Sequence, residues 1–210
     1  MDFNWLSTRL KADTANMGLH LSEANIKKIQ GYLELLDKWN QVHNLSGIKD
    51  IHQMVAYHIV DSLSIVPYIQ GHNICDVGTG AGLPSIPVSI VMENHHFHLI
   101  ESRQKKISFL NQAKLHLNLE NITVERARVE SFNYPLKFDM VISRAFASLK
   151  DFILLSAYLL KPGGLMLAMK GQLSGDELEG VPKGFKIVKF IPVNVAGVIG
   201  ERNLVLIKAH

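Results

Sequence analysis

A glycine-rich turn near residue 80 combines an acidic side chain with the backbone freedom that a tightly held ligand requires. Asp76 precedes Gly78, Gly80 and Gly82, and Leu83 follows them. Glycine is needed where the backbone takes a positive φ, or where a ligand approaches too closely for a Cβ atom. Because a short apolar run ends at this turn, we predict a buried strand before it and a helix from about Leu83 after it. A turn in this position is typical of sites that bind an adenosine cofactor.

The glycine spacing distinguishes between two cofactor classes. Dinucleotide-binding enzymes use G-x-G-x-x-G, whereas this turn reads G-x-G-x-G with an acidic residue two positions before it. Counted from Gly78 or from Gly80, the third glycine position holds Leu83 or Ser85. This spacing favours S-adenosyl-L-methionine over NAD, with a dehydrogenase as the alternative. Glu101, at the end of the next predicted strand, can accept hydrogen bonds from both ribose hydroxyls in either class.

The residue types narrow the range of possible methyl acceptors. Methylation of cytosine C5 needs a cysteine nucleophile, and the only cysteine, Cys75, lies within the first predicted strand. Adenine amino methylation goes with a D/N-P-P-Y/F/W motif, whereas residues 143–146 read SRAF. Guanine N7 has a free lone pair and no proton to remove, so an enzyme needs only to position it for in-line transfer. A small-molecule methyltransferase and an inactive cofactor-binding module that interacts with RNA stay open as alternatives.

The composition of the 210 residues is that of one globular unit with a small extension. Hydrophobic residues make up 47% and charged residues 20%, and the net charge of +3 permits nucleic-acid binding without requiring it. The start of the sequence has no basic segment followed by an apolar core, and no apolar run approaches the ~20 residues of a membrane span. We therefore expect a cytoplasmic protein that does not contact membranes.

The periodicity of apolar residues predicts the elements that carry these groups. Residues 1–70 read as a helical extension, with one helix capped by Ser22 and another from about Ile51 to Val66. The capped helix would bury positions 26, 29, 33, 36, 39 and 42. Residues 71–210 alternate between strands and helices, with a tight turn at 162–164 before the fifth strand and further helices around 107–117 and 152–160. The predicted strands are 74–77, 97–100, 121–124, 138–142, 165–169, 185–191 and 204–207.

This order predicts an α/β fold of the Rossmann-like class I methyltransferase type. A mostly parallel seven-stranded sheet would carry helices on both faces and end in an antiparallel hairpin, because no clear helix separates the last two strands. The ligand would lie beyond the carboxyl ends of the strands, beside the first one. Residues 71–210 would form one compact methyltransferase domain, and residues 1–70 its N-terminal extension.

Short motifs along nearly the whole chain resemble the RsmG (GidB) family of bacterial methyltransferases. Besides the turn, the matching stretches are WN at 39–40, NLSGI at 44–48, HIVDSL at 58–63, RVE at 128–130, FD at 138–139, SRAFASL at 143–149, KG at 170–171 and GER at 200–202. The resemblance implies methylation of guanine N7 in the 530 loop of 16S ribosomal RNA. It also implies that 16S rRNA or the small ribosomal subunit is the partner of a monomeric enzyme.

The resemblance also implies residue roles. Asp76, Gly78, Gly80, Gly82 and Leu83 would form the cofactor site, with Glu101 on the ribose and Val129 and Glu130 beside the adenine. Arg144 would lie at the methionine end or at the target base, and Arg128, Lys170 and Arg202 would gather round the reaction centre to contact RNA. His58 and Asp61 would support the site, or simply form a surface pair.

Three positions depart from the family pattern, and one cluster suggests a metal. Ser85 replaces a usual glycine, Ser46 a common threonine, and Glu101 a usual aspartate. His96 and His98 would share one face of a strand, but no carboxylate or cysteine is near them in sequence. We therefore expect a polar strand edge there and no metal.

Overall fold

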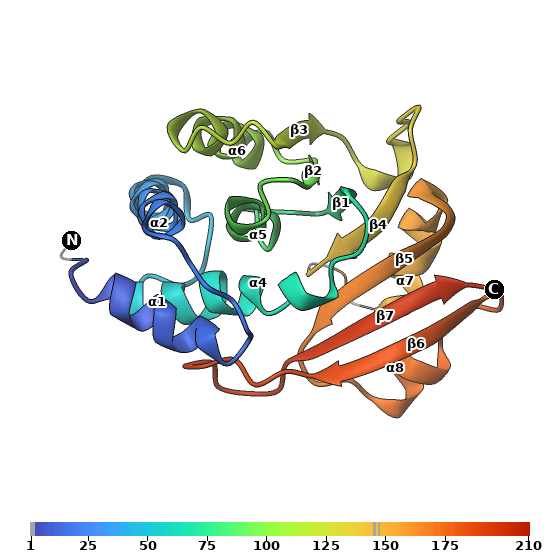
Figure 1. Ribbon diagram of the computed structural model, residues 1–210. Coiled ribbons are helices and arrows are strands. Elements are labelled where there is room, and N and C mark those ends of the chain that lie inside the picture. Colours follow the sequence, from blue (N-terminus) through green and yellow to red (C-terminus); the bar gives the residue numbers. More distant parts are fainter. Residues whose placement is uncertain (1–2, 145, 147) are drawn as a thin grey trace.

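Seven strands form a single sheet in the order β3-β2-β1-β4-β5-β7-β6, in a computed structural model that describes residues 3–144, 146 and 148–210 (Figure 1). Strands β1 to β5 are parallel, and β7 is antiparallel to both β5 and β6. The prediction of a mostly parallel sheet ending in an antiparallel hairpin is confirmed. The strands are β1 (Asn73–Val77), β2 (His96–Glu101), β3 (Ile122–Arg126), β4 (Phe138–Ser143), β5 (Leu160–Lys170), β6 (Phe185–Pro192) and β7 (Asn203–Ala209).

Helices cover both faces of the sheet, as predicted (Figure 1). The α-helices are α1 (Leu6–Ala15), α2 (Glu23–His43), α3 (Ile51–Met54), α4 (Asp61–Leu63), α5 (Ser85–Val91), α6 (Gln104–His116), α7 (Leu149–Ser156) and α8 (Gly175–Glu179). A π-helical segment (Val55–Val60) joins α3 to α4, and short 3₁₀ turns occupy Val66–Tyr68, Val129–Ser131 and Ala157–Leu159. None of the helices among these described residues is long and apolar enough to cross a membrane.

Two hydrophobic clusters lie on opposite faces of the sheet because alternate strand residues point to opposite sides. On β1, Ile74 belongs to the cluster beneath α2, α5 and α6, whereas Cys75 belongs to the cluster beneath α7. The first cluster also contains residues of α1 and of the helical segment from 51 to 63, such as Leu10 and Ile59. The N-terminal helices therefore share a core with one face of the sheet.

Helix α2 has the predicted beginning and a shorter apolar face than predicted. The Ser22 side chain accepts a hydrogen bond from the backbone N–H of Asn25, whose side chain accepts in return from the Ser22 N–H. The helix ends at His43, and the capping residue Asn44 takes a left-handed conformation with φ of 48°. Val42, predicted on the buried face, is 75% exposed, because the last turn of the helix extends beyond the sheet-covering core.

Other boundaries differ where tertiary pairing overrides local signals. The helix predicted from Ile51 to Val66 ends at Leu63 and contains the π-helical segment, and the helix expected from Leu83 begins at Ser85. The predicted turn at 162–164 is an irregularity inside β5, because Leu160 pairs with Phe138 and Leu165 already pairs with Met140. The helix predicted at 152–160 begins earlier, at Leu149, where the Ser148 side chain accepts a hydrogen bond from the Asp151 N–H.

Candidate active site

The three glycines of the turn after β1 all require the conformation that was predicted for them. Gly78, Gly80 and Gly82 have φ values of 72°, 65° and 84°, which L side chains rarely adopt. A Cβ atom at position 82 would lie 2.3 Å from the Ile86 Cδ1 atom, whereas one at position 80 would lie no closer than 3.5 Å from the Lys106 Nζ atom. Gly82 is therefore needed so that Ile86 can pack behind the turn, whereas Gly80 faces the side of the turn that has open space.

Asp76 supports the turn from behind. Its side chain is fully buried, and its Oδ2 atom accepts a hydrogen bond of 2.6 Å from the Thr79 hydroxyl. Burial raises the pKa of Asp76 to about 6, against the lowering effects of Thr79, Ser85 and Arg144. Because no part of this carboxylate reaches the surface, Asp76 shapes the turn and does not line a cavity. Ser85, the departure from the family glycine, is buried beside it.

Hydrogen bonds to Glu101 link the turn to the beginning of α6. Its Oε2 atom accepts a hydrogen bond of 3.1 Å from the Gly80 N–H, and its Oε1 atom accepts 2.9 Å hydrogen bonds from the Ser102 and Arg103 N–H groups. The Lys106 ammonium lies 3.6 Å from Oε2. This carboxylate is thus held rigidly at the end of β2, where the ribose of an adenosine was predicted.

Two hollows open along the carboxyl edge of the sheet. A cavity of about 220 Å³ lies over the glycine turn and is lined by Leu45, Ser46, His58, Gly78, Thr79, Gly80, Ala81, Leu83, Lys106 and Arg144. A more open hollow of about 740 Å³ lies between the ends of β2 and β3 and is lined by Ser102, Arg103, Arg126, Ala127, Arg128 and Ser131. Val129 and Glu130 follow it in a 3₁₀ turn without lining it. Glu101 lies between the residues that line these two spaces.

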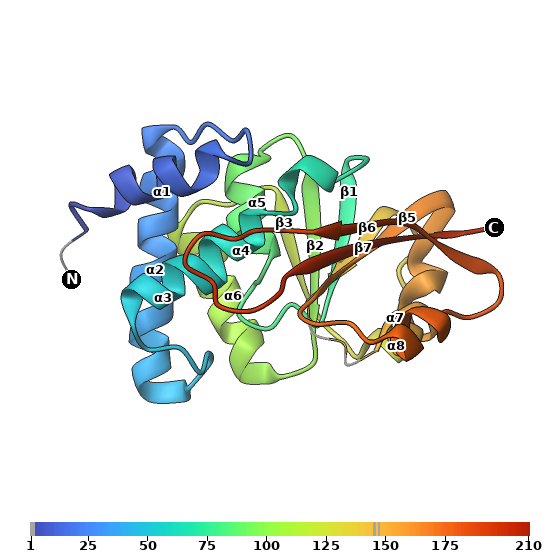
Figure 2. The ribbon, with the colours of Figure 1, turned by 90° about the horizontal axis from the view of Figure 1, so that it is seen from below.

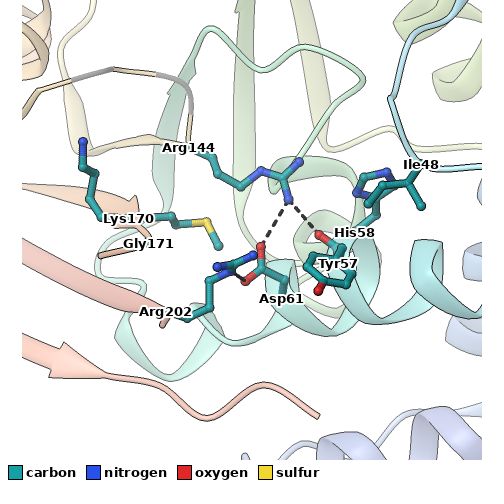
Figure 3. Close-up of a pocket in the computed structure, with 9 residues that line it drawn as sticks. Ile48, Tyr57, His58, Asp61, Arg144, Lys170, Gly171 and Arg202 are labelled. Carbon is teal, nitrogen blue, oxygen red and sulfur yellow. Dashed lines mark hydrogen bonds and ion pairs between the residues drawn. The ribbon is translucent and has the colours of Figure 1, made fainter. Parts of the chain in front are cut away.

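A third cavity, of about 360 Å³, adjoins the one over the turn, because His58 and Arg144 line both (Figure 3). Its walls are Ile48, Tyr57, His58, Asp61, Arg144, Met169, Lys170, Gly171 and Arg202. We call it the acceptor cavity. It combines half-buried apolar groups, such as Ile48 and the Tyr57 ring, with three cationic side chains.

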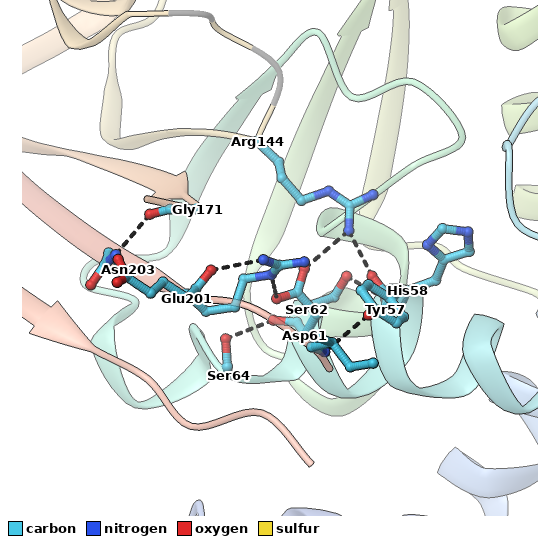
Figure 4. A network of polar contacts seen from close by, with 11 residues as sticks. Tyr57, His58, Asp61, Ser62, Ser64, Arg144, Gly171, Glu201 and Asn203 are labelled. Atoms are coloured by element: carbon cyan, nitrogen blue, oxygen red, sulfur yellow. Dashed lines mark hydrogen bonds and ion pairs between the residues drawn. The ribbon is translucent and has the colours of Figure 1, made fainter. Parts of the chain in front are cut away.

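A buried carboxylate holds two of those cations in place (Figure 4). Asp61 is 3% exposed, and its Oδ2 and Oδ1 atoms lie 3.3 Å from Arg144 Nη1 and 3.2 Å from Arg202 Nε. Arg144 Nη1 also donates a 3.0 Å hydrogen bond to the Tyr57 carbonyl. Burial raises the pKa of Asp61 even though both arginines lower it. Asp61 thus bridges two guanidinium groups, and its role in supporting the site stays a prediction.

The sheet topology explains how residues distant in sequence reach this cavity. Arg144 directly follows β4, and Lys170 ends β5 at the same edge. Because β7 runs antiparallel to β5, its first residue, Asn203, pairs with Lys170, and Arg202 arrives at the carboxyl edge with it. The Asn203 side chain donates a 2.7 Å hydrogen bond to the Gly171 carbonyl and fixes this junction.

The structure brings together only part of the predicted cationic cluster. Lys170 lines the acceptor cavity, but its ammonium lies 2.7 Å from Glu177 and donates to the Phe146 carbonyl, and it points away from Arg202 (Figure 3). Arg128 lines the hollow between β2 and β3 and not the acceptor cavity, so the structure does not bring it together with Arg144 and Arg202 as predicted. It follows β3, the edge strand, and four other strands separate it from β7.

Some lining residues had no sequence signal of their own. Tyr57 and Met169 lie next to matched motifs but belong to none of them. Ser46 Oγ lies 2.6 Å from His58 Nε2, and burial together with Arg144 lowers the pKa of His58 to about 4. His58 is therefore neutral near pH 7. Within the SRAFASL stretch, Ala145 and Ala147 lie outside the described residues.

The histidines of β2 make local contacts. His96 Nε2 lies 2.8 Å from the Thr123 hydroxyl, and the His98 ring packs against Tyr134 and Phe138. Among the residues that the structure describes, no group of three or more histidine, cysteine or acidic side chains is placed to hold a metal ion.

Comparison with known proteins decides the family. Residues 25–205 match the GidB family, described as rRNA small subunit methyltransferase G. The chain belongs to this family. Ribosomal RNA small subunit methyltransferase G of Aromatoleum aromaticum is 44% identical over 206 residues, which are 96% of this chain and 98% of the relative. The protein of that name from Escherichia fergusonii is 43% identical over 207 residues, which are 99% and 98% of the two chains.

A solved structure shows that the fold is shared more widely. The glycopeptide N-methyltransferase MtfA, complexed with S-adenosyl-L-methionine, superposes with a TM-score of 0.60 over 73% of this chain and 95% of its own, at 11% identity. The chain is a methyltransferase that uses S-adenosyl-L-methionine. Its own residues fit this cofactor, because Gly80 leaves open the space that a Cβ atom would fill, and the Glu101 carboxylate is fixed beside the Gly80 N–H at the end of β2.

Proposed function

We propose that this chain methylates N7 of a guanine in 16S ribosomal RNA, and that it does so in the cytoplasm. The names of the relatives support small-subunit RNA as the substrate. The observation that carries the proposal is the pair of arginines that Asp61 holds inside the acceptor cavity, directly beside the cavity over the glycine turn. Guanidinium groups are well suited to phosphate and to the O6 atom of guanine.

The shape of the acceptor cavity suits one nucleobase. Ile48 and the half-buried Tyr57 ring offer apolar surface for the face of a base, and Arg144 and Arg202 offer donors for its edge. The Arg202 guanidinium also lies 5.6 Å from the centre of the Tyr57 ring, which keeps both groups in place. A volume of about 360 Å³ is at the lower end of small-ligand pockets, so the cavity favours a single flat ring system.

The reaction requires the protein chiefly to position the cofactor and the guanine. The bound cofactor supplies an electrophilic methyl group on a sulfonium. Gly78, Gly80 and Leu83 would hold it over the turn, with Asp76 and Gly82 supporting the turn from behind. Because guanine N7 carries no proton, no general base is required.

The charges around the acceptor cavity suit a product that becomes cationic. His58 is neutral, since burial and Arg144 lower its pKa to about 4, so it adds no positive charge beside the methyl group. The Asp61 carboxylate offsets part of the charge of Arg144 and Arg202. Arg144 thus serves as a donor to the guanine without making the site strongly repulsive to methylated base.

The hollow between β2 and β3 would take the adenine. Ser102 and Ala127 lie at the ends of neighbouring strands on its two sides, directly after Glu101 on one of them. Arg128, at the rim of this hollow, would then contact the cofactor or an RNA phosphate far from the target base. Val129 and Glu130, in the 3₁₀ turn that follows, would lie beside the adenine.

The test is incorporation of radiolabelled methyl from S-adenosyl-L-methionine into 16S rRNA, both naked and in the small subunit. An RNA with 7-deazaguanine at the labelled position, which lacks N7, should accept no label. Arg144→Ala should reduce transfer strongly, and Lys186→Ala, an exposed lysine on β6, is the matched control for lost charge. The proposal fails if label never enters either form of 16S rRNA, or if it enters the deaza RNA equally.

A further inference from the structure

The connection between β6 and β7, residues 193–202, is a closed loop fastened to the N-terminal helices. The Val193 N–H donates a 2.8 Å hydrogen bond to the Arg202 carbonyl and closes its base, and Val195 is buried in the core. At Gly197 an added Cβ atom would lie 3.1 Å from the Ala56 Cβ atom, so the loop packs directly on the π-helical segment. Figure 2 shows this dark red loop lying across the helices of residues 51–63. Its conformation is therefore set by packing.

One side chain of this loop is exposed. Ile199 is 88% exposed, more than any other large hydrophobic side chain in the described part of the chain. Its backbone N–H donates a 2.9 Å hydrogen bond to the Tyr57 hydroxyl. Single exposed apolar side chains are common and prove nothing alone. Here, however, the backbone beneath the side chain is tied down, so the loop holds an aliphatic group in water at a fixed place.

That place is next to two residues that line the acceptor cavity, although Ile199 itself does not line it. Tyr57, which anchors Ile199, lines the cavity, and Arg202, three residues later in the same loop, lines it as well. Gly200, between them, has φ of 97°, which lets the chain turn sharply there, and a Cβ atom added to it would meet nothing within 4 Å. The Arg202 guanidinium inside the cavity and the exposed Ile199 side chain thus belong to one loop, which packing on the π-helical segment and the bond to Tyr57 hold in place.

An apolar side chain beside a base-sized cavity has a specific use. A base that enters a cavity leaves its stacked neighbours, and proteins offset this cost with aliphatic side chains that pack against the exposed base faces. Resting on the proposed function, we propose that Ile199 is a positioning residue that packs against the RNA bases flanking the target guanine. It stabilises the extruded guanine and takes no part in methyl transfer itself.

The proposal predicts a defect that depends on RNA structure. Methylation kinetics would be measured for wild type, Ile199→Ala and Ile199→Leu on two RNAs that contain the same guanine, one a folded 16S fragment and one a short unpaired oligonucleotide. Ile199→Ala should lower kcat/KM on the folded RNA by about tenfold to a hundredfold, the effect of losing one base-step contact, and by less than about twofold on the unpaired RNA. Ile199→Leu should retain most of the activity on both.

Control variants distinguish a specific effect of Ile199 from a general loss of exposed apolar surface or of cofactor binding. Leu115→Ala removes a different exposed aliphatic side chain, 80% exposed near the end of α6, and should change kcat/KM on neither RNA. Cofactor affinity by calorimetry should be equal in all variants. Equal activity of Ile199→Ala and wild type on folded RNA would overturn the inference, and so would equal losses on both RNAs. If wild type methylates neither of these RNAs, nor 16S rRNA in naked or subunit form, the proposed function fails instead.

Discussion

Asp76→Asn should make the protein more stable at neutral pH. The Asp76 carboxylate is fully buried, and its pKa is raised from 3.8 to about 6, chiefly by burial. A difference of about two pKa units corresponds to about 3 kcal/mol of free energy of unfolding that the ionised form forfeits. Asparagine keeps the shape and an oxygen that can accept the Thr79 hydroxyl hydrogen bond. It removes the buried charge, so the free energy of unfolding should increase by close to about 3 kcal/mol.

The pH dependence has a definite sign. Because the folded-state pKa of Asp76 is the higher one, the stability that its protonated form provides is complete below about pH 4 and is lost as the pH rises through about 6. The free energy of unfolding of Asp76→Asn minus that of wild type should therefore grow between pH 4 and 6 and become constant above about pH 7. Subtracting the two proteins cancels the titration of all other groups.

Urea denaturation at closely spaced pH values between 4 and 8 measures this difference, provided both proteins share one m-value. Glu120→Gln, at an exposed position between α6 and β3, is the matched control for the change in net charge. A stability difference that does not vary with pH would contradict the account of Asp76 as a buried, costly carboxylate. So would a variant less stable than wild type at pH 8.

Three further changes test the turn and the acceptor cavity. Gly82→Ala should lower the free energy of unfolding by about 2–4 kcal/mol, because its Cβ atom would lie 2.3 Å from Ile86 and φ is positive; urea denaturation measures this. Glu101→Ala should weaken cofactor binding at least about tenfold by calorimetry, since it frees the Gly80 N–H and removes the ribose acceptor; unchanged affinity refutes that role. Asp61→Asn should lower methyl transfer at least about tenfold with cofactor affinity retained, and parallel losses of both would refute a bridge specific to the acceptor side.

Much of the fold was accessible from the sequence because its signals are local. The glycines at 78, 80 and 82 predicted positive φ, and the alternation of apolar strands with helices predicted a mostly parallel sheet. Ser22 also capped its helix as predicted. Boundaries failed where long-range pairing decides. The continuation of β5 through Pro162 depends on its pairing with β4, which no local pattern encodes.

The candidate site was predicted in composition but not in arrangement. Motifs indicated Arg144, Arg202 and Asp61, yet only the antiparallel entry of β7 shows that one carboxylate bridges both arginines. The position of Arg128 beyond β3 could not be known without the strand order. The pairing of Lys170 with a glutamate of α8 was equally invisible, because neither residue marks the other in sequence.

The π-helical segment makes residue number, and not only residue identity, a constraint on this site. A π turn holds one residue more than an α-helical turn, so Val55–Val60 acts as a one-residue insertion between α3 and α4. The wider π-helical turn takes up that residue, because the six π-helical residues turn the chain about as far as roughly five α-helical residues would, so Asp61 keeps the orientation that faces both arginines. Deleting one residue there would let the helix become regular with little rotation of Asp61. Inserting one more residue would instead rotate Asp61 by about 100° relative to the buried Met54 and turn it away from both arginines. The segment should therefore tolerate the loss of one residue far better than the gain of one.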